Sequence, residues 1–166
     1  MKRLLFVLLS VLFITNLNAQ ENFDFLIGKS VIAEFDYSSA KIDKLDAEDF
    51  FLEENRSNPN FEYLYKKRML DIFIENCNNK VDKWCMLYKE NENAEYKMIV
   101  KILRIDDDGA HHADIIITKI NSNEILEKFH VGTNGGKWNT FFNLSAEYVE
   151  KLGDKTGIYI KRRITQ

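Results

Sequence analysis

Apolar residues recur every three or four positions near the C-terminus, the spacing that lines one face of an α-helix. The pattern predicts a long amphipathic helix over residues 137–164. Its apolar stripe includes Trp138, Phe141, Phe142, Tyr148, Val149, Leu152, Ile160 and Ile164. Gly153 and Gly157 lie on the same stripe, where they would let the helix approach a sheet closely. The alternative ends the helix at Gly153 and makes residues 158–164 a last strand, but the stripe keeps its register through both glycines.

The first half of the chain reads as strand, helix, strand. Residues 30–37 alternate apolar and polar side chains, which predicts a half-buried strand. An acidic segment follows and holds one or two helical turns capped by Asp46. Asn58 and Pro59 then open a helix over residues 59–76, and residues 84–88 form a short apolar strand. If the two strands are parallel, this crossover should be right-handed.

Residues 95–131 predict three consecutive strands joined by tight turns. The strands cover residues 95–105, 112–120 and 125–131, with turns at residues 106–109 and 121–124. Short turns between strands favour an antiparallel meander. The predicted fold is therefore α+β, a two-layer sandwich in which a mixed five-stranded sheet packs against two helices, residues 59–76 and 137–164.

The N-terminus has the pattern of a secretory signal peptide. Two basic residues precede an apolar run from Leu4 to Ile14, and a polar exit ends in Ala19. Cleavage there would leave Gln20 as the new N-terminus. A retained anchor is the weaker alternative, because a membrane span needs about 20 apolar residues. We expect a single domain over residues 20–166, periplasmic or secreted, with no transmembrane segment in the mature chain.

Charge argues against a nucleic-acid partner. Without residues 1–19 the chain has 21 basic and 26 acidic side chains, a net charge of −5. Proteins that bind nucleic acids concentrate an excess of basic residues on one face.

Cys77 and Cys85 are the two cysteines of the chain. In an oxidising compartment they could form a disulfide that closes a short loop. The alternative is a pair of buried thiols on different elements, and the spacing does not decide between them.

No motif of the sequence defines a catalytic or cofactor site. Residues 106–108 and the two histidines His111 and His112 are dense in metal ligands, but an Asp-rich turn ending in glycine needs no metal. Adjacent strand residues also point to opposite faces. The glycine-rich residues 132–136 lack the lysine and hydroxyl pattern of a phosphate-binding loop. We expect no catalytic residue, no metal site and no cofactor.

Two non-enzymatic functions remain. A sheet with a free edge strand can accept a strand from a partner, which favours a protein-interaction module. The alternative is a small-ligand carrier, with a cavity between sheet and helices lined by Tyr96, Trp138, Phe141 and Tyr148.

The layout resembles a group of uncharacterised secreted proteins of gut and oral bacteria. The resemblance lies in residues 31–39 (VIAEFDYSS), residues 46–50 (DAEDF), residues 96–100 (YKMIV) and the pair Gly135 and Gly136. More remotely, the order of elements is similar to the TolB amino-terminal domain and to curli-secretion proteins. That similarity implies an envelope protein that assembles with a protein partner, and it carries over no functional residue.

Overall fold

A computed structural model describes residues 23–122, 124–136 and 139–166 of the 166-residue chain. In chain order its elements are the 3-10 helix η1 (Phe23–Leu26), β1 (Lys29–Asp36), β2 (Lys41–Ile42), β3 (Leu45–Asp46), α2 (Ala47–Ser57), α3 (Phe61–Val81), β4 (Cys85–Tyr88), β5 (Tyr96–Ile105), β6 (His111–Lys119), β7 (Ile125–Gly132) and α4 (Phe141–Ile164). The predicted leader and the cleavage site at Ala19 and Gln20 lie outside the described residues.

The described strands form one mixed sheet. β1 lies between β4 and β5 and is parallel to both, which confirms the predicted crossover. β5, β6 and β7 form the predicted antiparallel meander. The sheet has seven strands where the sequence predicted five. The two additional strands, β2 and β3, have two residues each and form a hairpin beside the end of β5. Two residues are too few to produce an alternating pattern.

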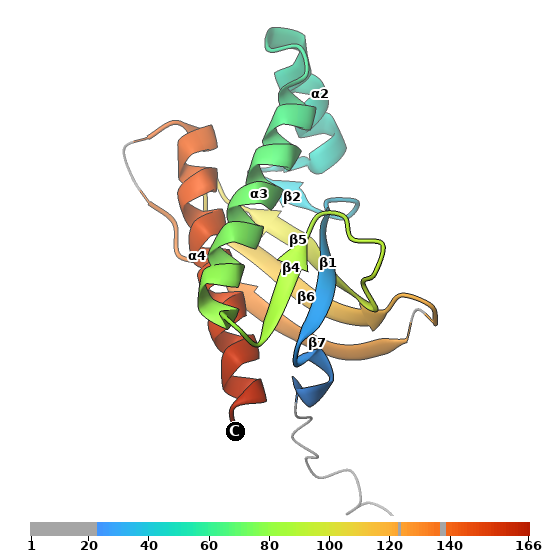
Figure 1. The fold of residues 1–166 in the computed structure, drawn as a ribbon. Coiled ribbons are helices and arrows are strands. Elements are labelled where there is room, and N and C mark those ends of the chain that lie inside the picture. Colours follow the sequence, from blue (N-terminus) through green and yellow to red (C-terminus); the bar gives the residue numbers. More distant parts are fainter. Residues whose placement is uncertain (1–22, 123, 137–138) are drawn as a thin grey trace, which may run out of the picture.

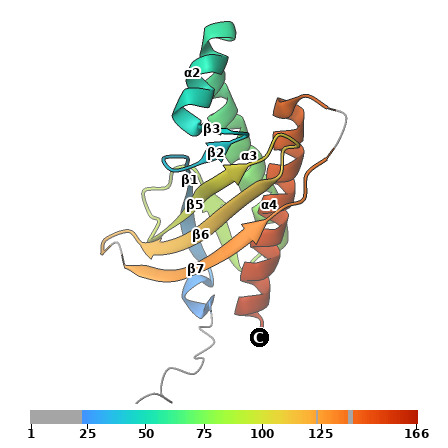
Figure 2. The ribbon, with the colours of Figure 1, turned by 180° about the vertical axis from the view of Figure 1, so that it is seen from behind.

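The long helices cover one face of the sheet. Figure 1 shows α3 and α4 side by side in front of the meander, and Figure 2 shows β5, β6 and β7 from behind. The buried side chains of β5, including Met98, Val100 and Ile102, all face the helices. Alternate residues such as Lys97 and Ile99 face the other side and are partly exposed. The predicted α+β two-layer sandwich is confirmed.

Helix α4 runs unbroken through both glycines, so the alternative with a last strand is wrong. The expected reason for the glycines is wrong too, because they approach α3 and not the sheet. A Cβ at Gly153 would lie 2.7 Å from the carbonyl oxygen of Phe73. A Cβ at Gly157 would lie 2.6 Å from the carbonyl oxygen of Cys77. The two helices are therefore in backbone contact at these positions.

Helix α3 differs from the prediction at both ends. Its N-cap is Asn60, whose φ of 71° is left-handed, and not Asn58. It also continues past residue 76 to Val81, because Cys77 and Val81 are fully buried and extend its apolar stripe. Helix α2 does follow Asp46, but no side-chain capping bond forms there. None of the helices in the described part of the chain has the length and hydropathy of a membrane span.

Candidate functional site

Half of β1 has no strand on its outer side. β4 pairs with Lys29 to Ile32 and then ends at Tyr88, whereas β1 continues to Asp36. On its other side β1 pairs with β5 as far as Asp36. Within the described sheet, residues 33–36 thus form a free edge. Alternate residues of a strand turn both backbone groups to the same side, so part of this half-edge offers unpaired N–H and C=O groups.

A groove of about 880 Å³ runs along this free half-edge. Its lining includes the consecutive residues Ile32, Ala33, Glu34 and Phe35 of β1. Side chains of a strand alternate between its two faces, so consecutive residues can share one groove only where that groove follows the strand edge. The groove therefore has the unpaired backbone of β1 along its floor.

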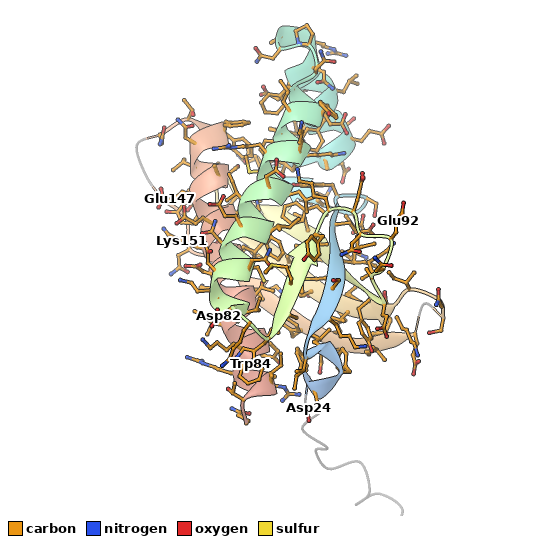
Figure 3. All side chains as sticks on the ribbon, viewed as in Figure 1. Asp24, Asp82, Trp84, Glu92, Glu147 and Lys151 are labelled. Carbon is orange, nitrogen blue, oxygen red and sulfur yellow. The ribbon has the colours of Figure 1, made fainter. Side chains whose placement is uncertain are left out.

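Side chains from two other elements line the groove. Tyr63, Lys66, Lys67 and Leu70 of α3 form one wall, the α3 wall. Lys89 and Glu90, which directly follow β4, also line the groove. The loop begins close to α3, because Lys89 pairs with Asp71 of that helix, and Figure 3 labels Glu92 further along the loop.

Most charged side chains of the groove are already paired. Lys66 lies 2.5 Å from the Glu62 carboxylate, and Lys89 pairs with Asp71. The Glu34 carboxylate oxygen Oε2 lies 3.3 Å from Nζ of Lys97. These pairs are partly exposed, so each contributes little to stability, about 0–1 kcal/mol.

A packed aromatic cluster closes the upper end of the groove. The ring of Tyr37 lies edge-on to Phe51, at 5.8 Å between centroids, and 6.4 Å from Tyr65. The Tyr37 side chain is buried, and this burial raises the pKa of its hydroxyl well above the usual value. The neutral Tyr37 ring is part of the lining of the groove. Nζ of Lys66 lies 4.8 Å from the centroid of the adjacent Phe51 ring.

The predicted ligand-lining residues do not converge on one cavity. Tyr96 packs against Phe25 at 5.4 Å, near the start of β5. Phe141 lies in the aromatic cluster, 5.1 Å from Phe50. Tyr148 borders a separate hollow of about 400 Å³ beside α4. Trp138 lies outside the described residues. Tyr96, Phe141 and Tyr148 are absent from the described lining of the groove along β1.

Cys77 and Cys85 are present as buried free thiols on α3 and β4. Burial, and to a smaller extent the neighbouring Cys85, raises the pKa of the Cys77 thiol well above its usual value. Burial also raises the pKa of Cys85 to about 12. Such thiols are protonated at neutral pH and therefore poor nucleophiles. A disulfide between Cys77 and Cys85 under oxidising conditions stays a prediction.

The histidines divide between the two faces of β6 and the neighbouring strand β7. His111 is fully buried, and its Nδ1 lies 2.8 Å from the carbonyl oxygen of Gly109. His112 and His130 stack on the uncovered face, with His130 3.2 Å from Asp114. The described residues contain no group of three or more His, Cys, Asp or Glu side chains that could hold a metal ion.

The glycine-rich connection before α4 packs tightly against the Asp-rich turn. A Cβ at Gly135 would overlap the Asp108 carboxylate, and the N–H of Gly136 donates to the Asp108 carbonyl at 3.0 Å. Close packing of two loops therefore accounts for Gly135 and Gly136.

On the exposed side of α4, Figure 3 shows Lys151 beside Glu147, and Nζ of Lys151 lies 2.7 Å from the Glu147 carboxylate.

The strand pattern of the sequence predicted a sheet with a free edge but not this groove. Its α3 wall consists of residues beside the core stripe, such as Tyr63, which is 64% exposed. An exposed aromatic ring outside the apolar stripe of an amphipathic helix was the one feature of the sequence that could have indicated a binding surface here.

The fold and groove define a class, an α+β protein whose mixed sheet has an accessible strand edge. No family model matches the chain, and no curated protein matches its sequence.

Several solved structures are similar to this fold. The PelC L103M dodecamer of Paraburkholderia phytofirmans has a TM-score of 0.45 at 8% identity, covering 80% of this chain and 87% of that chain. Protein XCC0632 of Xanthomonas campestris has a TM-score of 0.43 at 8% identity, covering 79% and 80%. The LpoB C-terminal domain of Salmonella enterica has a TM-score of 0.27 at 9% identity, covering 64% and 83%.

Proposed function

We propose that this protein is a non-enzymatic binding module of the bacterial envelope that takes up an extended segment of a partner protein as an added strand beside β1. The observation that carries the proposal is the groove with the free edge of residues 33–36 along its floor. Strand addition uses backbone hydrogen bonds for affinity and side-chain contacts in the groove for specificity. The leader-like residues 1–19 support a location in the periplasm or outside the cell.

The other long free edge, on β7, is less suited to strand addition. The carbonyl oxygen of Gly132 already accepts Lys155 of α4 at 2.6 Å. Lys128 is exposed on the same strand, and lysines on an edge strand disfavour pairing with another chain. The half-edge of β1 instead lies in a groove whose α3 wall can hold a segment in place.

The first test uses a displayed library of random decapeptides selected on the purified mature protein. A selected peptide is then synthesised in versions that carry one N-methyl group at each position in turn. In an added strand, every second N–H points at β1, so methylation at alternate positions should weaken binding by about tenfold or more. Methylation at the intervening positions should have little effect.

Two variants locate the binding site on the protein. Tyr63→Ala removes an exposed ring from the α3 wall and should weaken peptide binding. Glu150→Ala changes an exposed residue of α4 away from the groove and serves as the control. Methylation effects without alternation, or equal affinity of the Tyr63→Ala variant and the wild type, would contradict strand addition at this edge.

A small-ligand carrier is the second candidate, and it is favoured by the volume of the groove. About 880 Å³ lies within the roughly 300–1,000 Å³ of small-molecule sites. A carrier should show a thermal shift with a small apolar compound that Tyr63→Ala reduces, together with no affinity for any peptide of the library.

A further inference from the structure

A side chain of α3 bonds to the outer edge of β4. The Asn78 side chain donates to the carbonyl oxygen of Leu87 at 3.0 Å, and its Oδ1 accepts the Leu87 N–H at 2.8 Å. Both backbone groups of Leu87 therefore point away from β1. One side-chain amide thus takes the place that a neighbouring strand would have there, and a partner strand finds no free backbone at Leu87.

The same bonds determine which backbone groups of β1 face the groove. Val31 lies opposite Leu87 in the parallel pair, so Val31 turns its N–H and C=O towards β4. The direction of these groups alternates along a strand, and Ala33 and Phe35 therefore turn theirs to the same side. Beyond Tyr88, where β4 has ended, that side is the groove.

The other neighbour of β1 gives the same assignment. The Glu95 carbonyl oxygen accepts the N–H of Ile120 at 3.0 Å, so the backbone groups of Glu95 point away from β1. Val100 is five residues further along the strand and points the opposite way, towards β1. Of two opposite residues in a parallel pair, only one turns its groups to the other. Phe35, which lies opposite Val100, therefore points away from β5 and into the groove.

Three backbone groups of β1 remain free in the groove. Tyr88 lies opposite Ile32 at the end of the β4 ladder, and in a parallel pair it bonds to the residues on both sides of Ile32. The N–H of Ala33 is used in this way. The carbonyl oxygen of Ala33 and both the N–H and the carbonyl oxygen of Phe35 have no strand to pair with in the described sheet.

We propose that the partner segment lies parallel to β1, continues the line of β4 and bonds through two residues that are two positions apart. The first donates its N–H to the Ala33 carbonyl oxygen and accepts the N–H of Phe35. The second donates its N–H to the Phe35 carbonyl oxygen. This inference rests on the proposed strand addition and adds the direction and the bonding pattern of the partner.

An antiparallel segment fits these three groups less well. It would place a residue opposite Ala33 whose carbonyl oxygen is directed at an N–H that Tyr88 already occupies. A segment that stops before Ala33 avoids this conflict but leaves the Ala33 carbonyl oxygen unbonded. The parallel direction uses all three groups without the conflict.

The pattern also limits the sequence of the partner. The residue between the two bonding residues turns its N–H away from β1, and its side chain lies on the same face as that of Phe35. That face is covered by α3, where Phe73 packs on Phe35 at 5.4 Å between ring centroids and Leu70 lines the groove. An apolar side chain therefore suits the middle position. Proline is also acceptable there, as on other edge strands, but not at the two bonding positions.

A proline scan of a selected library peptide tests the bonding pattern. Proline at either of two positions, two residues apart, should weaken binding by about tenfold or more, because it removes the N–H. Proline between them should change the affinity by less than about threefold. Alanine at each bonding position keeps the N–H and is the matched control. Sensitivity to proline at adjacent positions would contradict the pattern.

A nitroxide label on the same peptide tests the direction. The label is attached just before the first bonding position or just after the second, and the amide signals of the isotope-labelled protein are recorded by NMR. Parallel addition places the first label near Lys89, at the end of β4, and the second near Ser38, beyond the end of β1. Each label should broaden the signal of its own neighbour more strongly. The reverse assignment would overturn the parallel direction.

Failure of this inference and failure of the proposed function give different results. Peptides that bind with two proline-sensitive positions but with the reverse label assignment would leave strand addition intact and make the direction wrong. If no peptide of the library binds the folded protein, the proposed function itself is wrong.

Discussion

His111 is a fully buried titratable residue of the sheet. Its side chain is fully buried, and burial lowers the pKa to about 4, opposed in part by the hydrogen bond to Gly109. A carbonyl oxygen can only accept, so Nδ1 carries the proton of the neutral ring. The sequence predicted that His111 and His112 face opposite sides, which the structure confirms. It could not predict the burial of His111, because a polar residue at a strand end gives no sign of what covers it.

Acid should destabilise the protein through His111. The unfolded ring binds a proton near pH 6.5 and the folded ring only near pH 4, so the unfolded state gains protons first as pH falls. Between pH 7 and pH 5 this should remove about 2 kcal/mol of the free energy of unfolding. Urea unfolding at both values should show the loss in the wild type and a smaller loss in His111→Gln. His130→Gln, at an exposed ring, is the control and should lose as much as the wild type.

At the scale of elements, the contact between α3 and α4 depends on two glycines. Periodicity predicted the unbroken course of α4 because its stripe of buried residues stays in register over 24 residues, but the helix begins at Phe141, after its N-cap Thr140, and not at residue 137. The sequence could not show which neighbour the glycines approach, since a helix or a sheet would require the same small side chain. The pattern within one helix does not specify the direction of its neighbour, and the crossing of α3 over Gly153 and Gly157 depends on the path of the whole crossover.

Gly157→Ala should destabilise the protein although alanine favours helix. The new methyl would lie 2.6 Å from the Cys77 carbonyl oxygen and 2.7 Å from the Lys80 Cβ. Overpacking of this kind costs about 1–3 kcal/mol, which exceeds the gain of about 1 kcal/mol in helix propensity. Urea unfolding should show a net loss, whereas Glu150→Ala, on the exposed side of α4, should change stability by less than about 0.5 kcal/mol. A more stable Gly157→Ala protein would contradict the close contact.

At the scale of the molecule, alternation and turn signals were sufficient to predict the meander and the crossover. They could not predict the groove, because it arises from a difference in length between β1 and β4. Where β4 ends relative to β1 depends on strand register, which no pattern in either strand specifies. The aromatic residues assigned to a ligand cavity illustrate the same limit, since Tyr96 and Phe141 pack at different places in one continuous core.

Hydrogen exchange should map the free half-edge directly. Amides in the middle of β5 and β6, such as those of Val100 and Ile115, have strands on both sides and should exchange slowest. Within residues 33–36 of β1, amides should alternate between slow and fast exchange, because every second N–H points away from β5. Uniformly slow exchange over these four residues would contradict a free edge, and a bound library peptide should slow the fast set.

The central place of β1 has a consequence for the order of events during synthesis. β1 is the first strand to be made, yet it pairs with Cys85 to Tyr88 and with Tyr96 to Lys101, more than 50 positions further along the chain. Contacts so distant form late, because a long loop must close before they stabilise anything. A growing chain therefore cannot complete the pairing of β1 until residue 101 of its 166 residues has been made. Such a delay would keep the polypeptide unfolded and extended for longer, the state that the proposed export through a translocation channel requires.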